Sequence, residues 1–275
     1  MGEIGNMVNA ISNFYDENLV FNHIIYKDLN VKNFPTHSHN LCEFLFVKRA
    51  NASYVIENRE YHLKENDLIF IRPQTYHYIK FESPQDYERY NLTFNSWSLK
   101  IDLDMIPEGA EIFHCKKDGI IENLFKKLDY YCHNLNKNIF AEILSYVSKE
   151  LVYNISLEKN AEQPSVHLST IVHNAVKYMN DNLFSIKDIK EVSNAIYVSQ
   201  NYLFNVFKKQ MKISPKKYLT EKRLLFAQNM INLGRRPTEI YTDCGFTNYP
   251  TFYRAYVNFF GHAPSQELNS HNSAN

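Results

Sequence analysis

Apolar residues recur at helical spacing in two short runs between residues 188 and 212. The first run follows Asp188 and Glu191, which have the spacing of a capping box at a helix N-terminus. The second run follows Ser199, a favourable N-cap residue, and its apolar stripe consists of Leu203, Val206 and Phe207. The pattern predicts two short helices that meet at a tight turn, the second running from Gln200 to Met211.

The polar face of the second helix carries amides first and lysines last. Its residues are Gln200, Asn201, Phe204, Asn205, Lys208 and Lys209. Amide side chains near a helix N-terminus can read adenine edges in the major groove, and lysine side chains reach phosphate. We interpret the unit as a helix-turn-helix that binds DNA through this face. A helical hairpin with a merely solvated polar face is the alternative, because no glycine marks the turn.

A second copy of the pattern runs from Thr238 to Phe260. Gly245 separates two apolar stripes, which consist of Ile240 and Cys244 before it and Phe252, Ala255, Tyr256 and Phe259 after it. Between the copies, residues 218–233 have helical periodicity and predict one long connecting helix that ends at Gly234. Two helix-turn-helix motifs in tandem favour DNA binding over a solvated hairpin.

Residues 171–268 resemble the DNA-binding domain of the AraC family of transcription regulators. The matching motifs, in order, are KYMNDN, SQNYLFNVFKKQ, ISPKKYL, RLLFAQ, EIYTDCGFTNYPTFYRAY and FFGHAPSQE. Arg236-Pro237 stands where a Ser or Asp usually caps the fifth helix, so we expect that helix without a side-chain cap. The resemblance implies an activator that works with RNA polymerase at promoter or operator DNA. We expect further DNA contacts from the second motif, at Asn248, Tyr249, Thr251 and Arg254.

Residues 23–97 have the sequence pattern of β-strands. Short segments rich in β-branched and aromatic residues, such as LCEFLFV, SYVIE, REYHL, DLIFI and YNLTF, alternate with turn residues. Close spacing without intervening helices predicts antiparallel hairpins in a small barrel or sandwich. The segments PTHSHNLCEFLFV and LKENDLIFIRPQTYH resemble the sensor cupin of the same family. Asn66 stands where cupins usually have glycine, so we expect it to be left-handed.

Three histidines and a glutamate gather in this region. His37, His39 and Glu43 have odd numbers and would share one face of an unbroken strand, and His77 follows in the next hairpin. We expect these residues, with Arg49 and Asn91, to bind a small-molecule effector, for which the resemblance makes a carbohydrate the first candidate. The alternative is a metal site at His37, His39, Glu43 and His77. Arg89 shares the parity of Asn91, which does not settle which face points inward.

Two amphipathic helices are predicted after the β-rich region, at residues 119–135 and 139–157. Their stripes can pack on the barrel wall, and the resemblance implies that one surface also forms a dimer contact. The sequence therefore predicts an α+β two-domain chain. Its parts are an N-terminal antiparallel cupin or jelly-roll β-barrel (1–112), a helical dimerisation segment (113–157), a linker (158–166) and an all-α DNA-binding domain with two helix-turn-helix motifs joined by a long helix (167–270).

Formal net charge is zero for the whole chain, but it is unevenly distributed. Residues 1–165 carry 17 Lys and Arg against 23 Asp and Glu, whereas residues 166–275 carry 13 against 7. The basic half is the half with the helix-turn-helix motifs, as phosphate attraction requires.

The remaining composition narrows the class of protein. Four cysteines without CxxC spacing predict neither a structural zinc site nor a disulfide framework. No long apolar run and no signal-like N-terminus occur, so we expect a cytoplasmic chain with no membrane association. The family resemblance implies that this chain forms a homodimer. We expect neither a cofactor nor enzymatic activity. The competing class is a metal-dependent cupin enzyme with a helical appendage.

Overall fold

The computed structural model describes residues 8–16, 18–30, 34–57, 59–107, 109–157, 166, 167 and 169–267. The chain divides into an N-terminal unit, residues 1–166, and a C-terminal unit, residues 167–275. Most of the expected linker lies outside the described residues. Within the described ranges, no helix is both long and apolar enough to cross a membrane.

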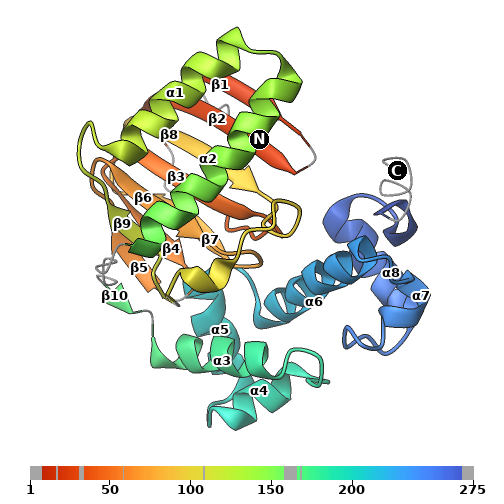
Figure 1. Ribbon diagram of the computed structural model, residues 1–275. Coiled ribbons are helices and arrows are strands. Elements are labelled where there is room, and N and C mark those ends of the chain that lie inside the picture. Colours follow the sequence, from red (N-terminus) through yellow and green to blue (C-terminus); the bar gives the residue numbers. More distant parts are fainter. Residues whose placement is uncertain are drawn as a thin grey trace. The chain divides into compact units, whose positions relative to one another are not determined.

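The N-terminal unit contains two antiparallel sheets (Figure 1). One has the order β1 (Val8–Tyr15), β2 (Leu19–Leu29), β8 (Gln85–Phe94), β3 (Cys42–Arg49), β6 (Asp67–Ile71) and β9 (Ile112–His114). The other has the order β5 (Arg59–His62), β4 (Ala52–Ile56) and β7 (His77–Phe81), with β10 (Val166–His167), the residues at which the two units join along the chain, next to β5. The strands thus form two sheets of a jelly-roll-like arrangement, not one closed barrel. The last strand of the larger sheet ends at His114, so the expected boundary at residue 112 cuts through it.

Alternation along the central strands separates two cores. In β3, Leu45 and Val47 point into the space between the sheets, where they pack with residues of the smaller sheet such as Tyr54 and Ile79. Phe44 and Phe46 point to the opposite face and pack under the helices. Because side chains alternate along a strand, the pairing register of β3 determines both which residues face the smaller sheet and which face the helices.

Helices α1 (Ile120–Asn134) and α2 (Lys137–Leu157) lie across the outer face of the larger sheet (Figure 1). Leu124, Phe125 and Leu128 of α1 and Leu144 and Leu151 of α2 are buried there. The two predicted helices and their packing on the sheet are confirmed.

The turn at Asn66 is left-handed, with φ +67°, as the sequence predicts. Strand β1 was not predicted, and β2 begins four residues before the expected β-rich region. Only two of the eight β1 residues are buried, so its hydrophobic pattern is weak, and the strand is held by pairing with β2.

The C-terminal unit is helical, with α3 (Thr170–Asp181), α4 (Ile189–Ala195), α5 (Gln200–Met211), α6 (Pro215–Asn232), α7 (Pro237–Ile240) and α8 (Tyr249–Phe260). The α5 bounds match the prediction, and the Ser199 hydroxyl accepts a hydrogen bond from the Tyr202 amide at 3.2 Å. Helix α6 is the expected long connection, and Gly234 follows it with φ +87°. Helix α7 starts at Pro237 without a side-chain cap, as expected.

Two details of the first motif differ from the sequence pattern. Ala195, which lies three residues after the buried Val192 at helical spacing, is exposed, while Ile189 and Ser193 of α4 are buried. The Asp188 side chain accepts from the Lys190 amide, but Glu191 accepts from the Lys187 amide and not from Asp188. Both side chains therefore accept hydrogen bonds at the N-terminus of α4, but they do not form the reciprocal pair of a capping box.

A buried arginine joins the two helix-turn-helix motifs. Arg223 of α6 donates to the carbonyl of Leu183 at 2.7 Å and of Ile186 at 2.6 Å, both just before α4, and to the carbonyl of Gly245 at 2.9 Å. Gly245 forms the turn of the second motif with φ +78°. One guanidinium therefore ties the entrance of the first motif to the turn of the second.

Candidate functional site

The histidine–glutamate cluster is assembled from three segments of the N-terminal unit. Glu43 lies on the inward face of β3, His77 begins β7, and His37 forms an isolated bridge with His77. His39 lies in the bend between His37 and β3. The expectation of one unbroken strand from His37 to Glu43 is wrong. The chain turns between them, and the turn directs the three side chains toward one another.

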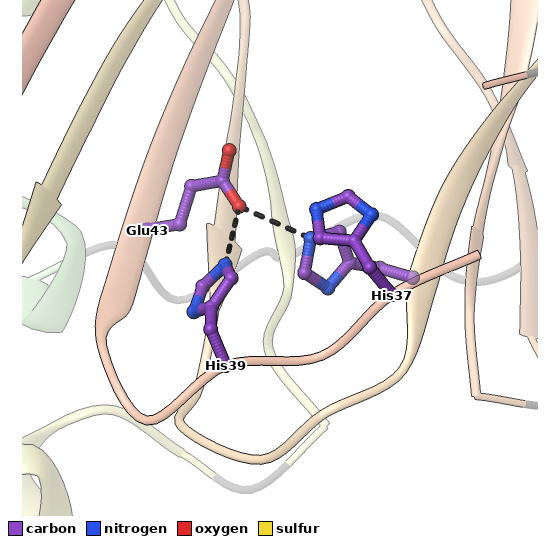
Figure 2. Close-up of side chains that lie close together, drawn as sticks. His37, His39 and Glu43 are labelled. Atoms are coloured by element: carbon purple, nitrogen blue, oxygen red, sulfur yellow. Dashed lines mark hydrogen bonds and ion pairs between the residues drawn. The ribbon is translucent and has the colours of Figure 1, made fainter. Parts of the chain in front are cut away.

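The side chains converge on one carboxylate oxygen (Figure 2). Glu43 Oε2 lies 3.1 Å from His39 Nε2 and 3.1 Å from His77 Nε2. His37 is adjacent, with its ring centroid 4.3 Å from that of His77. His77 and Glu43 are buried, whereas His37 is exposed, so the cluster meets solvent on the His37 side.

Backbone carbonyls hold all three imidazoles in the same way. Each Nδ1 pairs with a carbonyl oxygen: His37 with Pro35 at 3.0 Å, His39 with Leu41 at 2.8 Å and His77 with Thr75 at 2.9 Å. Since a carbonyl can only accept, Nδ1 carries the proton, and Nε2 of each neutral ring keeps its lone pair.

Electrostatics favour a charged Glu43. Burial works against its carboxylate, but the close contacts with His39 and His77 outweigh burial and hold its pKa well below the usual value. Burial likewise opposes a proton on His39, yet the hydrogen bond to Glu43 raises the pKa of that histidine. The cluster therefore holds a charged carboxylate beside a histidine that takes up a proton more readily than usual.

Of the other expected effector residues, the structure brings Asn91 to the cluster and leaves Arg49 out. Asn91 on β8 is buried and donates through Nδ2 to Glu43 Oε1. Arg49 is more than half exposed and pairs with Asp86 at 3.2 Å. The register of β3 against β8 shifts between Val47 and Arg49, so Arg49 does not continue the inward face of Glu43, Leu45 and Val47.

Two further residues lie beside this cluster: Tyr54, which the sequence analysis did not name, and Arg89, for which it left the face open. Tyr54 is buried on β4 with its ring stacked 6.1 Å from that of His77. Arg89 pairs with Val47 across β8 and β3, which places it on the inward face, and its guanidinium donates to Asn22 at 3.4 Å. The sequence placed Arg89 on the same face of its strand as Asn91. Only the pairing of β8 with β3 shows that this face points inward.

In the C-terminal unit, α5 exposes the whole expected DNA-binding face. All six expected residues are exposed: Gln200, Asn201, Phe204, Asn205, Lys208 and Lys209. The opposite face buries Leu203, Phe207 and Met211. Lys208 Nζ lies 5.6 Å from the centre of the Phe204 ring.

Helix α8 offers a less uniform face. Thr251 and Arg254 are exposed, as expected, but Asn248 is the N-cap, whose side-chain oxygen accepts from the Thr251 amide at 2.9 Å. Tyr249 is half-buried against Tyr241 and Phe252. Tyr253, which the sequence reasoning passed over, is exposed one turn after Tyr249. Cap chemistry at Asn248 was the available signal for its structural role.

Comparisons with known proteins agree on both units. The model of the AraC-like ligand binding domain matches residues 24–126, and the model of a helix-turn-helix domain matches residues 192–270. The HTH-type transcriptional activator RhaR of Escherichia coli (strain K12) is 22% identical over 257 residues, covering 86% of this chain and 88% of RhaR. RhaR of Shigella dysenteriae is 21% identical with the same coverage.

Solved structures include ToxT from Vibrio cholerae, 11% identical, which covers 92% of this chain and 98% of its own at a TM-score of 0.37. An AraC-type regulator from Chromobacterium violaceum is 27% identical over 36% of this chain and 89% of its own, with a TM-score of 0.34. The two domain models together cover both units in the order of the sequence motifs. The chain belongs to the AraC family of transcription regulators, with a ligand-binding domain followed by a helix-turn-helix DNA-binding domain.

Proposed function

We propose that this regulator reads promoter DNA through α5 and α8 and responds to a small molecule bound beside the histidine–glutamate cluster. The observation that carries the proposal is the exposed face of α5, on which amides precede lysines from the N-terminus onward. Amides suit base edges and lysines suit phosphates. The regulator acts where the chromosome lies, in the cytoplasm.

The effector site combines the groups that a polar ligand needs. Glu43 and Asn91 accept and donate hydrogen bonds, and Tyr54 supplies an apolar ring. A carbohydrate presents hydroxyls and apolar faces together, which suits this set. ToxT has been solved with an unsaturated fatty acid bound, so an acyl carboxylate is the second candidate ligand.

Activation through RNA polymerase is proposed from the relatives, since RhaR is named a transcriptional activator. A homodimer is proposed from the outer face of α1 and α2. That face exposes large apolar or aromatic side chains, namely Tyr130, Ile139, Tyr146, Tyr153 and Leu157. We propose no catalytic role for the sheets, and a turnover assay with candidate effectors tests the cupin-enzyme alternative.

Two matched variants of α5 test base reading against phosphate holding. Asn205→Ala should cost about 1–3 kcal/mol on the preferred duplex and little on unrelated duplex, because a base contact serves one sequence. Lys209→Ala should weaken both complexes in similar proportion. Binding titrations of each variant on both duplexes at one salt concentration measure the two ratios. An unchanged specificity ratio in Asn205→Ala would remove α5 from the major groove.

A further inference from the structure

The histidine–glutamate cluster has a geometry that hydrogen bonding alone does not satisfy. Each Nδ1 pairs with a carbonyl, so while the rings are neutral the Nε2 lone pairs of His39 and His77 both face Glu43 Oε2 at 3.1 Å. The buried Nε2 of His77 lies close to Glu43 Oε2 but outside hydrogen-bond geometry, and no other described residue bonds to it. Lone pairs facing a carboxylate repel it unless a cation lies among them.

Protons satisfy this arrangement poorly. The rings of His39 and His77 lie with their centroids 5.2 Å apart, and both approach the same oxygen of Glu43. A proton shared between that oxygen and one ring leaves the contact with the other ring unbridged. A single ion with two charges satisfies both contacts at once.

The distances suit one metal ion. One atom from each of His37, His39, Glu43 and His77 lies within 4.8 Å of all the others. Metal–nitrogen bonds of about 2.0–2.1 Å place two ligand atoms about 3 Å apart at right angles and about 4.2 Å apart when opposite. The four side chains need only small movements to close around an ion.

Each of the four side chains also has the outer partner that a metal ligand needs. Carbonyls orient the three imidazoles through Nδ1, and Asn91 Nδ2 holds Glu43 Oε1, which leaves Oε2 directed at the histidines. Such partners fix the tautomer and the direction of the ligand atoms. Four potential ligand side chains, each held by an outer partner, therefore lie close together. An effector that is bound through a hydroxyl or an amide pair does not require so many oriented groups.

We propose that His37, His39, Glu43 and His77 bind one divalent first-row transition-metal ion in the N-terminal unit. Three imidazole nitrogens favour an ion such as Zn²⁺, Fe²⁺ or Ni²⁺ over Mg²⁺ or Ca²⁺, which prefer oxygen ligands. Three neutral histidines and one carboxylate leave the bound ion with net positive charge on the side where His37 is exposed. Its open positions suit an oxygen donor of the effector, and this regulatory role rests on the function proposed above.

The test uses the full chain after chelator treatment and removal of the chelator. Isothermal titration with Zn²⁺ should give one ion per chain, with Mg²⁺ silent, and Zn²⁺ should raise the melting temperature. His39→Ala and Glu43→Gln should each weaken binding by more than about 100-fold, and Asn91→Ala by about 10–100-fold. His62→Ala is the matched control, because His62 is exposed on β5 and should leave the affinity unchanged.

A second measurement covers variants that fold poorly. Co²⁺ bound to the native chain should give visible ligand-field absorption and nitrogen ligands by X-ray absorption, both lost with His37→Ala, whose side chain is exposed. Zinc binding that is absent, or equal in all variants, or lost in His62→Ala, overturns the site. A DNA titration of the native chain distinguishes the failure of this site from the failure of the proposed function. If the chain binds no DNA either with or without Zn²⁺, the proposed function is contradicted. If it binds DNA but not Zn²⁺, only the metal site is contradicted.

Discussion

Gly245→Ala should disrupt the clamp that joins the two helix-turn-helix motifs. A Cβ at Gly245 would lie 2.8 Å from Cζ and Nε of Arg223 and 2.9 Å from the Phe184 carbonyl oxygen. The residue also has φ +78°, which L-residues rarely adopt. Gly234 is the matched control, because its φ is +87° and nothing lies within 4 Å of its Cβ position.

The two substitutions should therefore differ in magnitude. Left-handed backbone costs an L-residue about 1–2 kcal/mol, and Gly234→Ala should lose that much stability. Gly245→Ala should lose a further 1.5–3 kcal/mol or so, because moving the guanidinium breaks at least one hydrogen bond from a charged donor. The total of about 2.5–5 kcal/mol is a large part of the stability of one domain.

Urea unfolding of the full chain, followed by helical circular dichroism, measures the difference, since the C-terminal unit is mainly helical. We also expect Gly245→Ala to weaken DNA binding under conditions where the protein stays folded, because Arg223 links both motifs. Equal losses in Gly245→Ala and Gly234→Ala would refute the packing argument. Unchanged DNA affinity in a folded Gly245→Ala variant would refute the role of the clamp.

Three further predictions concern other sites. Burial opposes a proton on His23, but hydrogen bonds to Asp129 and Glu88 outweigh burial and raise its pKa above 6.5. The contribution of His23 to stability should be complete below pH 6.5 and should be lost as pH rises through the raised pKa. Melting temperatures of the native protein and of His23→Gln should therefore differ most at the low end of this range and converge as pH rises. Tyr197 is 95% exposed and has φ +58°, a left-handed backbone that glycine adopts without strain. The variant Tyr197→Gly should therefore be more stable by about 1 kcal/mol, as measured by urea unfolding. Ser199→Ala should remove the α5 cap and cost about 1 kcal/mol in the same assay.

Local chemistry made much of the fold predictable. The bounds of α5 follow from the Ser199 cap and the helical spacing of its apolar residues, and the left-handed turn at Asn66 follows from the residue type. Helices α1 and α2 follow from amphipathic stripes long enough to leave no ambiguity with strands. These features depend on neighbours within one or two turns of chain.

Features that depend on distant pairing were missed or misplaced. Strand β1 buries few side chains and exists through its partner β2. The cluster was expected from residue types, but its assembly through a bend and a bridge to His77 is invisible to strand parity. Arg223 had a usable signal, since a charged residue stands on the buried stripe of α6 at i+4 from Leu219, yet its three carbonyl partners come from two other segments.

The central claim is that two recognition helices of one chain read two neighbouring stretches of duplex. Selection of bound duplexes from a random-sequence pool tests it most directly. The selected duplexes should show two short blocks of base preference about one helical turn, roughly 34 Å, apart. Asn205→Ala should erase preference in one block and Arg254→Ala in the other. A single block, no enrichment, or loss of both blocks in a folded single variant would contradict it.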